Sequence, residues 1–183
     1  GYVDNFLAQR VFGSLLVPDA QTFELHPYLA ESWTWSKDRK KVVFNLNKKA
    51  MWSDGTPVTA DDVVFTYNSV TNPDYKPSVT NLIGRYKSVR ALNSHQVELE
   101  FKKPGFIELL HFANYMMIRP KHFYENLKDS SKWVKEAVGF GPYRVKKFIA
   151  GQELLIEKVN NWWGNDLPAM HDQNKLPLIL MKF

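Results

Sequence analysis

The sequence predicts an α+β fold, in which strand hairpins form a mixed sheet and amphipathic helices pack against it. Paired alternating segments near residues 33–46, 89–101 and 143–159 indicate strand hairpins. A turn-rich segment at 53–57 precedes a stretch with helical periodicity. At 183 residues, with 44% hydrophobic and 14% aromatic content, the chain is large enough to bury a substantial core.

The first hairpin is indicated by apolar residues at every second position on either side of a charged turn at Lys37–Lys41. These residues are Trp33, Trp35, Val42, Phe44 and Leu46. Because successive side chains of a strand point to opposite faces, they form one buried face, with polar residues such as Ser32 and Thr34 on the other.

A helix is expected to begin at Ala60, directly after the turn formers of residues 53–57. Thr59 is a suitable N-cap, and Asp62 stands where a capping box places its acidic residue. The helix should face the core along a stripe of apolar side chains. This stripe comprises Val63, Tyr67 and Val70, with Val64 beside it.

The middle of the chain is predicted in the same way. Residues 72–88 contain two prolines and a glycine and indicate a surface excursion, followed by strands at 89–92 and 97–101. An amphipathic helix follows, with an apolar stripe of Phe106, Leu109, Leu110 and Ala113. Residues 116–118 indicate a buried strand, and Pro120 opens a short helix in which Phe123, Tyr124 and Leu127 pack. A last hairpin is expected over 143–148 and 153–159.

Composition and motifs exclude several function classes. The absence of cysteine rules out disulfides, thiolate nucleophiles and cysteine-based zinc sites. None of the five histidines has the i, i+4 spacing or context of a helical zinc site, and no phosphate-binding or nucleophile-elbow motif occurs, so no cofactor and no enzymatic activity are expected. No apolar run approaches the length of a membrane span, and no signal peptide is visible at Gly1.

Two motifs resemble those of the solute-binding proteins of ABC importers that carry oligopeptides, dipeptides or nickel complexes. The first, from Pro27 to Phe65, resembles the family's "P-x-L-A-x-S-W" strand, its second strand and its "DG-x-P-l-T-a-x-DV-x-f" segment. The second, Val138–Tyr143, resembles "V-G-T-G-P-Y", and Glu153–Gly164 resembles the element that ends in "Y-W-G". Leu178–Phe183 is similar to the strand that follows this element.

The resemblance implies the first lobe of a bilobed fold of the type II periplasmic-binding-protein kind, similar to dipeptide-binding proteins. Residues 1–183 are expected to form most of that lobe, and the second lobe is absent. Within it, residues of approximately 1–28 and 137–183 would form a core subdomain, and residues 29–136 an inserted subdomain.

The resemblance also implies a function. The chain would capture oligo- or dipeptides outside the cytoplasmic membrane, in the periplasm or associated with the membrane through the permease, and deliver them to the permease subunits. It would be a monomer that binds no nucleic acid. The alternative on the same scaffold is a receptor for nickel chelates or another small solute.

Four residues are candidates for ligand contact. By position relative to Pro120, Asn114, Tyr115 and Met116 resemble the first-lobe stretch that lines the cleft, and they offer an amide, an aromatic hydroxyl and a soft thioether. The alternative is that Tyr115 and Met116 are core residues. Phe140 stands where the family usually has threonine, and it either shapes a hinge or pocket or only packs.

Two other classes stay open. A formal charge of +5 and a basic turn at Lys37–Lys41 would suit a nucleic-acid-binding module if that turn shared one face with Lys146 and Lys147. Adjacent tryptophans at 162 and 163 would suit a carbohydrate-binding module if their rings were exposed and coplanar.

Overall fold

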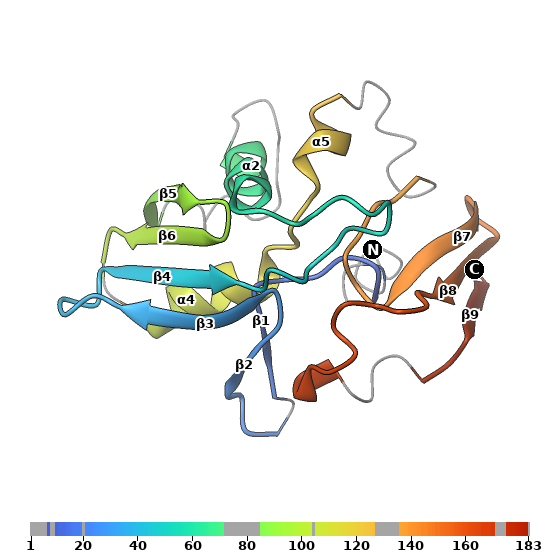
Figure 1. Cartoon of the computed structure of the whole chain (residues 1–183), viewed down its shortest axis with the longest axis horizontal. Helices are drawn as coiled ribbons and strands as arrows, with labels where there is room; N and C mark the ends of the chain where they lie inside the picture. Colours follow the sequence, from blue (N-terminus) through green and yellow to red (C-terminus); the bar gives the residue numbers. More distant parts are fainter. Residues whose placement is uncertain are drawn as a thin grey trace.

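A computed structural model describes residues 7, 10–19, 21–71, 85–103, 105–126, 136–170 and 175–182. Their strands form three antiparallel sheets, which are spread along the longest axis of the molecule (Figure 1). A two-stranded sheet pairs β1 (Leu16–Pro18) with β2 (Leu25–Pro27). The four-stranded sheet has the order β3-β4-β6-β5, and the three-stranded sheet has the order β7-β8-β9.

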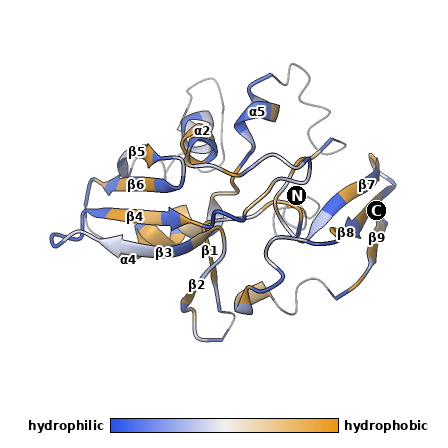
Figure 2. Cartoon of the chain, viewed as in Figure 1, coloured by the Kyte–Doolittle hydropathy of each residue, from blue (hydrophilic) through white to orange (hydrophobic). Residues whose placement is uncertain are grey.

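The four-stranded sheet is built from β3 (Ala30–Trp35), β4 (Lys41–Leu46), β5 (Tyr86–Asn93) and β6 (Gln96–Phe101). Apolar and polar residues alternate along β4 and β6 (Figure 2), so that one face is buried. The inward residues of these two strands are Val42, Phe44, Leu46, Val97, Leu99 and Phe101. Trp33 and Trp35 pack against this core from β3. The predicted hairpin is therefore confirmed.

One expectation in this region was wrong. Residues 72–88 were assigned to a surface excursion, but β5 already begins at Tyr86, whose ring is buried. Tyr86 packs against Phe112 with ring centroids 5.4 Å apart, and this burial extends the strand beyond the local turn signals. Residues 72–84 lie outside the described residues.

The helix α2 (Ala60–Thr71) begins where the sequence predicts. The carboxylate of Asp62 accepts a hydrogen bond of 2.8 Å from the Thr59 amide, which is the reciprocal half of a capping box. Val63 is buried as expected, and Tyr67 and Val64 pack on the core. However, the buried face also includes the polar side chains of Asp62 and Thr66, which the predicted apolar stripe did not contain.

The next helix changes type along its length. The α-helical turn α4 (Phe106–Leu110) continues directly into a π-helix, η1 (His111–Tyr115). The buried residues of this segment are Leu109, Phe112 and Ala113, at positions i, i+3 and i+4. The predicted stripe was therefore wrong for Phe106, which is 59% exposed.

The segment after the π-helix is extended but is not the strand that the sequence predicted. Residues 116–120 pair with no strand among the described residues, although Ile118 is fully buried. The short helix α5 (Lys121–Tyr124) then begins after Pro120, as predicted. Phe123 and Tyr124 are only half-buried, and Leu127 lies outside the described residues.

The three-stranded sheet contains β7 (Tyr143–Ile149), β8 (Glu153–Lys158) and β9 (Leu178–Lys182). The first two strands form the predicted hairpin, and a short 3₁₀ turn, η3 (Pro168–Met170), lies between the second and third strands in the sequence. The inner face of this three-stranded sheet packs on a second hydrophobic cluster, which is separate from the main one. The buried members of this second cluster are Leu7, Val11, Phe12, Ala137, Tyr143, Leu154 and Ile156.

Candidate functional site

The π-helix η1 packs against β1 and carries two of the predicted ligand-binding residues, Asn114 and Tyr115, and Met116 follows directly after it. Tyr115 is 62% exposed, whereas Asn114 and Met116 are half-buried. Met116 packs against the main hydrophobic cluster. π-Helical turns occur often at functional sites, because the extra residue per turn redirects the side chains. Of these three residues, Tyr115 offers the largest surface to a ligand.

His111 belongs to the same π-turn and was not singled out in the sequence. Its ring lies 5.3 Å from that of Tyr115 with a tilt of 35°. Its Nδ1 atom is buried and has no hydrogen-bond partner among the described residues. A histidine and a tyrosine four residues apart in a helical segment share a face, and this spacing is the signal that would have identified the pair.

Phe140 lies in an aromatic cluster beneath the surface rather than beside Tyr115. Its side chain is 1% exposed and packs against Tyr28 and Trp52 at centroid distances of 5.4 and 5.3 Å. Its carbonyl oxygen accepts hydrogen bonds from the indole N–H groups of Trp162 and Trp163, at 2.7 and 2.9 Å. Of the two alternatives for this residue, the geometry therefore favours packing.

Gly13 explains why a phenylalanine fits at position 140. A Cβ atom on Gly13 would lie 2.3 Å from the Phe140 ring, so the ring occupies the space that a side chain would take. The carbonyl of Gly13 also accepts a hydrogen bond of 2.9 Å from the Ile118 amide. Gly13 thus contacts both the Phe140 cluster and the chain that follows Met116. The role of the four predicted residues in ligand contact stays a prediction.

The site is electrically neutral along the segment that carries it. Residues 111–118 include no Asp, Glu, Lys or Arg. Burial raises the pKa of Tyr28 above its ordinary value of 10.0, and its hydroxyl has no hydrogen-bond partner among the described residues. The described part of the chain also contains no group of three His, Asp or Glu side chains that could hold a metal ion. Such a surface binds by hydrogen bonding, stacking and shape rather than by charge pairing.

One ionisable pair joins α5 to the loop of residues 53–57. His122 Nε2 lies 2.7 Å from a carboxylate oxygen of Asp54. Partial burial raises the pKa of Asp54, but hydrogen bonds from His122 and Thr56 outweigh this effect and hold the pKa below its ordinary value of 3.8. The next residue back, Ser53, donates its amide to the Gly139 carbonyl at 2.8 Å. This loop therefore joins α5 to the turn that carries Phe140.

The tryptophan pair does not meet the requirement of a carbohydrate platform. Trp162 is 4% exposed, and the planes of the Trp162 and Trp163 rings are inclined by 57°. Their shared hydrogen bonding to Phe140 gives both indoles a structural role.

The two basic segments do not share a face. The turn of Lys37–Lys41 forms the tip between β3 and β4, at the opposite end of the molecule from Lys146 and Lys147 on β7 (Figure 1). The latter two pair with Glu157 and Glu153 at 3.0 and 2.6 Å. The single basic face that would favour a nucleic-acid-binding module is therefore missing.

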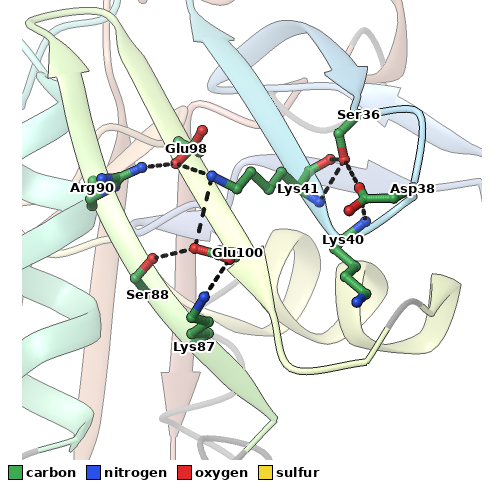
Figure 3. Close-up of polar contacts among 9 residues, drawn as sticks. All are labelled: Ser36, Asp38, Lys40, Lys41, Lys87, Ser88, Arg90, Glu98 and Glu100. Atoms are coloured by element: carbon green, nitrogen blue, oxygen red, sulfur yellow. Dashed lines mark hydrogen bonds and ion pairs between the residues drawn. The ribbon is translucent and has the colours of Figure 1, made fainter.

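The hairpin tip itself concentrates positive charge. The carboxylate of Asp38 is engaged within the turn, where it accepts hydrogen bonds from the Ser36 hydroxyl and the Lys40 amide at 2.6 and 3.1 Å (Figure 3). The Phe101 amide donates to the Lys40 carbonyl at 2.8 Å, which brings the end of β6 to the tip. Five exposed cations gather there without an ion pair among the described residues: Lys37, Arg39, Lys40, Lys102 and Lys103.

The fold and these motifs define a solute-binding protein. The sequence profile of the bacterial extracellular solute-binding proteins, family 5 Middle, matches residues 24–174, and the chain belongs to this family. The predicted α+β class and family fold are thus confirmed.

Known proteins show how far the similarity extends. The peptidoglycan-binding protein YepA of Agrobacterium fabrum is 32% identical over 171 residues, which are 92% of this chain and 28% of that protein. The periplasmic oligopeptide-binding protein OppA of Salmonella typhimurium is 27% identical over 199 residues, covering 97% of this chain and 36% of that protein. The crystal structure of NikZ from Campylobacter jejuni in complex with Ni(L-His) is also similar, with 29% sequence identity and a TM-score of 0.81. The matched region covers 95% of this chain and 34% of the NikZ chain. The chain therefore spans 28–36% of the length of these three proteins.

None of the helices among the described residues is long and apolar enough to cross a bilayer.

Proposed function

We propose that this chain is part of the substrate-binding protein of an ABC importer, which captures peptides and delivers them to the membrane permease. The protein acts as a receptor and not as a catalyst. It works in the periplasm, or outside the cytoplasmic membrane in association with the permease. It is a monomer and binds no nucleic acid. The observation that carries this proposal is the family match over residues 24–174.

The surface at η1 suits the recognition of a peptide main chain. Tyr115 presents an exposed ring and hydroxyl, and Asn114 adds an amide that both donates and accepts. Groups of this kind pair with backbone N–H and C=O groups, which every peptide has, and so give affinity without a strict sequence preference. Met116 supplies an adaptable apolar contact, and Phe140 supports the site from beneath through Gly13.

We also propose that the lobe is divided into a core subdomain of approximately 1–28 and 137–183 and an inserted subdomain of 29–136. In support, the buried members of the second hydrophobic cluster all come from 7–12 and 137–156. The main cluster joins the two parts, because it contains Phe140 and Trp162 together with Trp52. The two subdomains would therefore move as one body.

The test is calorimetric titration of a mixed di- to pentapeptide library into the protein at the full length that its gene encodes, at two salt concentrations. We expect tight binding with little salt dependence, because the site is neutral. Tyr115→Ala should weaken binding by about tenfold, as expected when an exposed aromatic contact is lost. Phe23→Ala is the matched control, since Phe23 is 73% exposed but lies in the turn between β1 and β2. Failure of the wild-type protein to bind any peptide would overturn the proposal.

A second candidate is a receptor for nickel chelates. It is favoured by the 29% identity to NikZ, whose structure holds Ni(L-His). Because the described residues hold no metal-binding cluster, the metal would have to arrive with its own ligands, as in that complex. Titration with Ni²⁺ alone and with Ni²⁺ plus L-histidine separates the two candidates. If the protein binds no peptide and releases heat on titration with Ni²⁺ plus L-histidine but not with Ni²⁺ alone, the nickel-chelate receptor is favoured.

A further inference from the structure

The extended chain from Met116 to Lys121 is held by side chains of α2 and by the segment of Gly13 rather than by a sheet. The Ile118 amide donates to the Gly13 carbonyl at 2.9 Å. The Arg119 amide donates to the Thr66 hydroxyl at 2.9 Å, and the Lys121 amide donates to Asp62 Oδ1 at 2.8 Å. Pro120 has no amide hydrogen. Every N–H group from Ile118 to Lys121 is therefore bonded, each to a different acceptor.

The two acceptors on α2 are unusual for the buried face of a helix. Thr66 is 1% exposed and Asp62 is 4% exposed, although apolar residues normally fill such a face. A buried hydroxyl or carboxylate is destabilising unless it is hydrogen-bonded. The two side chains are retained at buried positions where they bind the backbone of another element, 53 and 59 residues further along the chain.

Both acceptors are held in a fixed orientation. The Thr66 hydroxyl donates its proton to the Asp62 carbonyl at 2.7 Å, which leaves its oxygen lone pairs available to the Arg119 amide. The carboxylate of Asp62 also accepts hydrogen bonds from the Thr59 amide at 2.8 Å and from the Trp52 indole at 3.3 Å. The capping of α2 and the anchoring of the extended chain thus use one carboxylate.

From these contacts we propose that Thr66 and Asp62 are positioning residues, which fix the ligand-contacting segment Asn114–Met116 by anchoring the chain three and five residues beyond it. This inference rests on the proposed function. The π-turn that carries Tyr115 is followed by an unpaired extended segment, so the anchors on α2 and at Gly13 set its direction. Thr66 acts on the ligand only through the segment that it holds.

The deciding variant is Thr66→Val, which keeps the shape of the side chain and removes the hydroxyl. Thr66→Ser restores the hydroxyl and serves as the rescue. Ser69→Ala is a matched control, because the Ser69 hydroxyl donates to the Phe65 carbonyl at 2.8 Å in the same i to i−4 manner but has no partner on another element within the described part of the chain. The three variants thus separate the tertiary bond from the local one.

Three quantities should be measured on the full-length protein: amide hydrogen exchange at Arg119, affinity for the peptide library, and the free energy of unfolding in urea. Thr66→Val should speed exchange at Arg119 and weaken peptide binding, each by about tenfold, which corresponds to the loss of one buried hydrogen bond. Thr66→Ser and Ser69→Ala should leave both unchanged. The measurement is made where every variant is almost fully folded, so a lower global stability alone would not move the affinity.

Two results would overturn the inference. In the first, the Arg119 amide stays protected in Thr66→Val, which means that the hydroxyl does not anchor the chain. In the second, protection is lost but peptide affinity is unchanged, which means that the anchor does not position the site. Failure of the proposed function is distinguishable from both, because then the wild-type protein itself binds no peptide.

Discussion

The four-stranded and three-stranded sheets are both antiparallel and both bury one face, but their other faces differ. In the four-stranded sheet, most outward positions of β4 and β6 carry polar side chains, with Val43 as an exception, and these polar side chains bond one another and those of β3 and β5. One row joins Asn45 to Ser32 at 2.9 Å, Gln96 to Asn45 at 2.8 Å, and Asn93 to Gln96 at 2.7 Å. These residues come from β4, β3, β6 and β5. The row therefore crosses the whole sheet.

A second row on the same face is ionic (Figure 3). Lys41 lies between Glu98 and Glu100, at 3.6 and 3.9 Å. From the other side, Arg90 pairs with Glu98, and Lys87 pairs with Glu100 at 2.8 Å. The cationic side chains are more exposed than the glutamates that they cover. This face is fully suited to contact with water.

The outer face of the three-stranded sheet has a different character at β9. Ile179 and Met181 face the second hydrophobic cluster, so Leu178 and Leu180 point the other way and are 49% and 52% exposed. Leu180 lies beside Leu155 of β8. A strand with apolar residues on both faces is typical of a sheet that is covered on both sides. The comparison teaches that polar residues at alternate positions of a strand mark a sheet face that meets water. Apolar residues at those positions, as on β9, mark a face that is suited to contact with something other than water.

The largest losses of stability are expected from Leu→Ala changes on the buried inner faces, and they should be similar in the two sheets because both inner faces are apolar. Leu99→Ala and Leu154→Ala each remove a fully buried side chain, and each should lower the free energy of unfolding by about 2–5 kcal/mol. Urea denaturation followed by circular dichroism measures this. Leu180→Ala is the control and should cost less than about 1 kcal/mol, because that side chain is half-exposed. If Leu154→Ala cost no more than Leu180→Ala, the second cluster would not be a true core.

A smaller effect is expected in the amide row. Gln96→Ala removes the hydrogen bonds to both Asn45 and Asn93, and it should lower the free energy of unfolding by about 1 kcal/mol. The double-mutant cycle with Asn45→Ala should show that the two changes are not additive. Strict additivity in urea denaturation would mean that the row is only a set of independent solvated side chains.

The exposed residues Leu178 and Leu180 should contribute little to the free energy of unfolding and more to the hydrophobicity of the surface. The double change Leu178→Thr and Leu180→Thr introduces β-branched residues, which suit a strand, and should alter the free energy of unfolding by less than about 1 kcal/mol. It should also reduce the binding of a hydrophobic dye and self-association, because an apolar stripe is removed. Val43→Thr, on the outer face of the other sheet, is the control and should change neither readout. Loss of stability comparable to that of Leu154→Ala would show that the leucines are part of the core.

The smallest effect concerns the ionic row and its pH dependence. The hydrogen bond from Lys87 holds the pKa of Glu100 below its ordinary value of 4.5, with burial opposing it and Lys41 adding to it. A carboxyl group whose pKa is lowered by folding stabilises the protein above its ordinary pKa, and this contribution is lost as the pH falls through the folded pKa.

Lys87→Met should therefore raise the pKa of Glu100 toward 4.5, which NMR titration of the carboxyl carbon measures. Lys147→Met is the control on the other sheet, where the bond from Lys147 is the main cause of the lowered pKa of Glu153. It should move Glu153 and leave Glu100 in place. A Glu100 pKa that is unchanged in Lys87→Met would assign the shift to other groups.

The elements that could be predicted are those whose patterns are local. The hairpin of β3 and β4, the start of α2 and the hairpin of β7 and β8 follow from alternation, turn formers and capping residues, which act within a few positions. The strand Leu178–Lys182 was anticipated from the family resemblance. The family resemblance extended this local information to the fold as a whole.

The errors arise where distant contacts decide the structure. Met116–Ile118 has the composition of a buried strand, but its neighbours are Gly13 and the polar face of α2, and no periodicity could reveal a bond between Arg119 and Thr66. The exposure of Phe106, the first residue of the predicted helical stripe, could not be predicted, because periodicity does not show where along a helix the contact with the core begins. Phe140 could not be assigned either, because its burial depends on the space above Gly13, more than a hundred residues earlier in the chain. The residues next to Phe140 in the sequence therefore do not indicate that its ring is buried against Gly13.

The basic tip between β3 and β4 has a consequence for the approach of the molecule to other charged bodies. Within the turn, its cations are accompanied by the single carboxylate of Asp38, which is already hydrogen-bonded to Ser36 and Lys40. On β7 and β8, by contrast, the cations Arg144, Lys146 and Lys147 are each paired with Glu157 or Glu153. The hairpin is therefore a local concentration of positive charge at one end of the long axis (Figure 1). Such a group of charges attracts an oppositely charged body before contact, and this attraction weakens as salt shortens the range of the field.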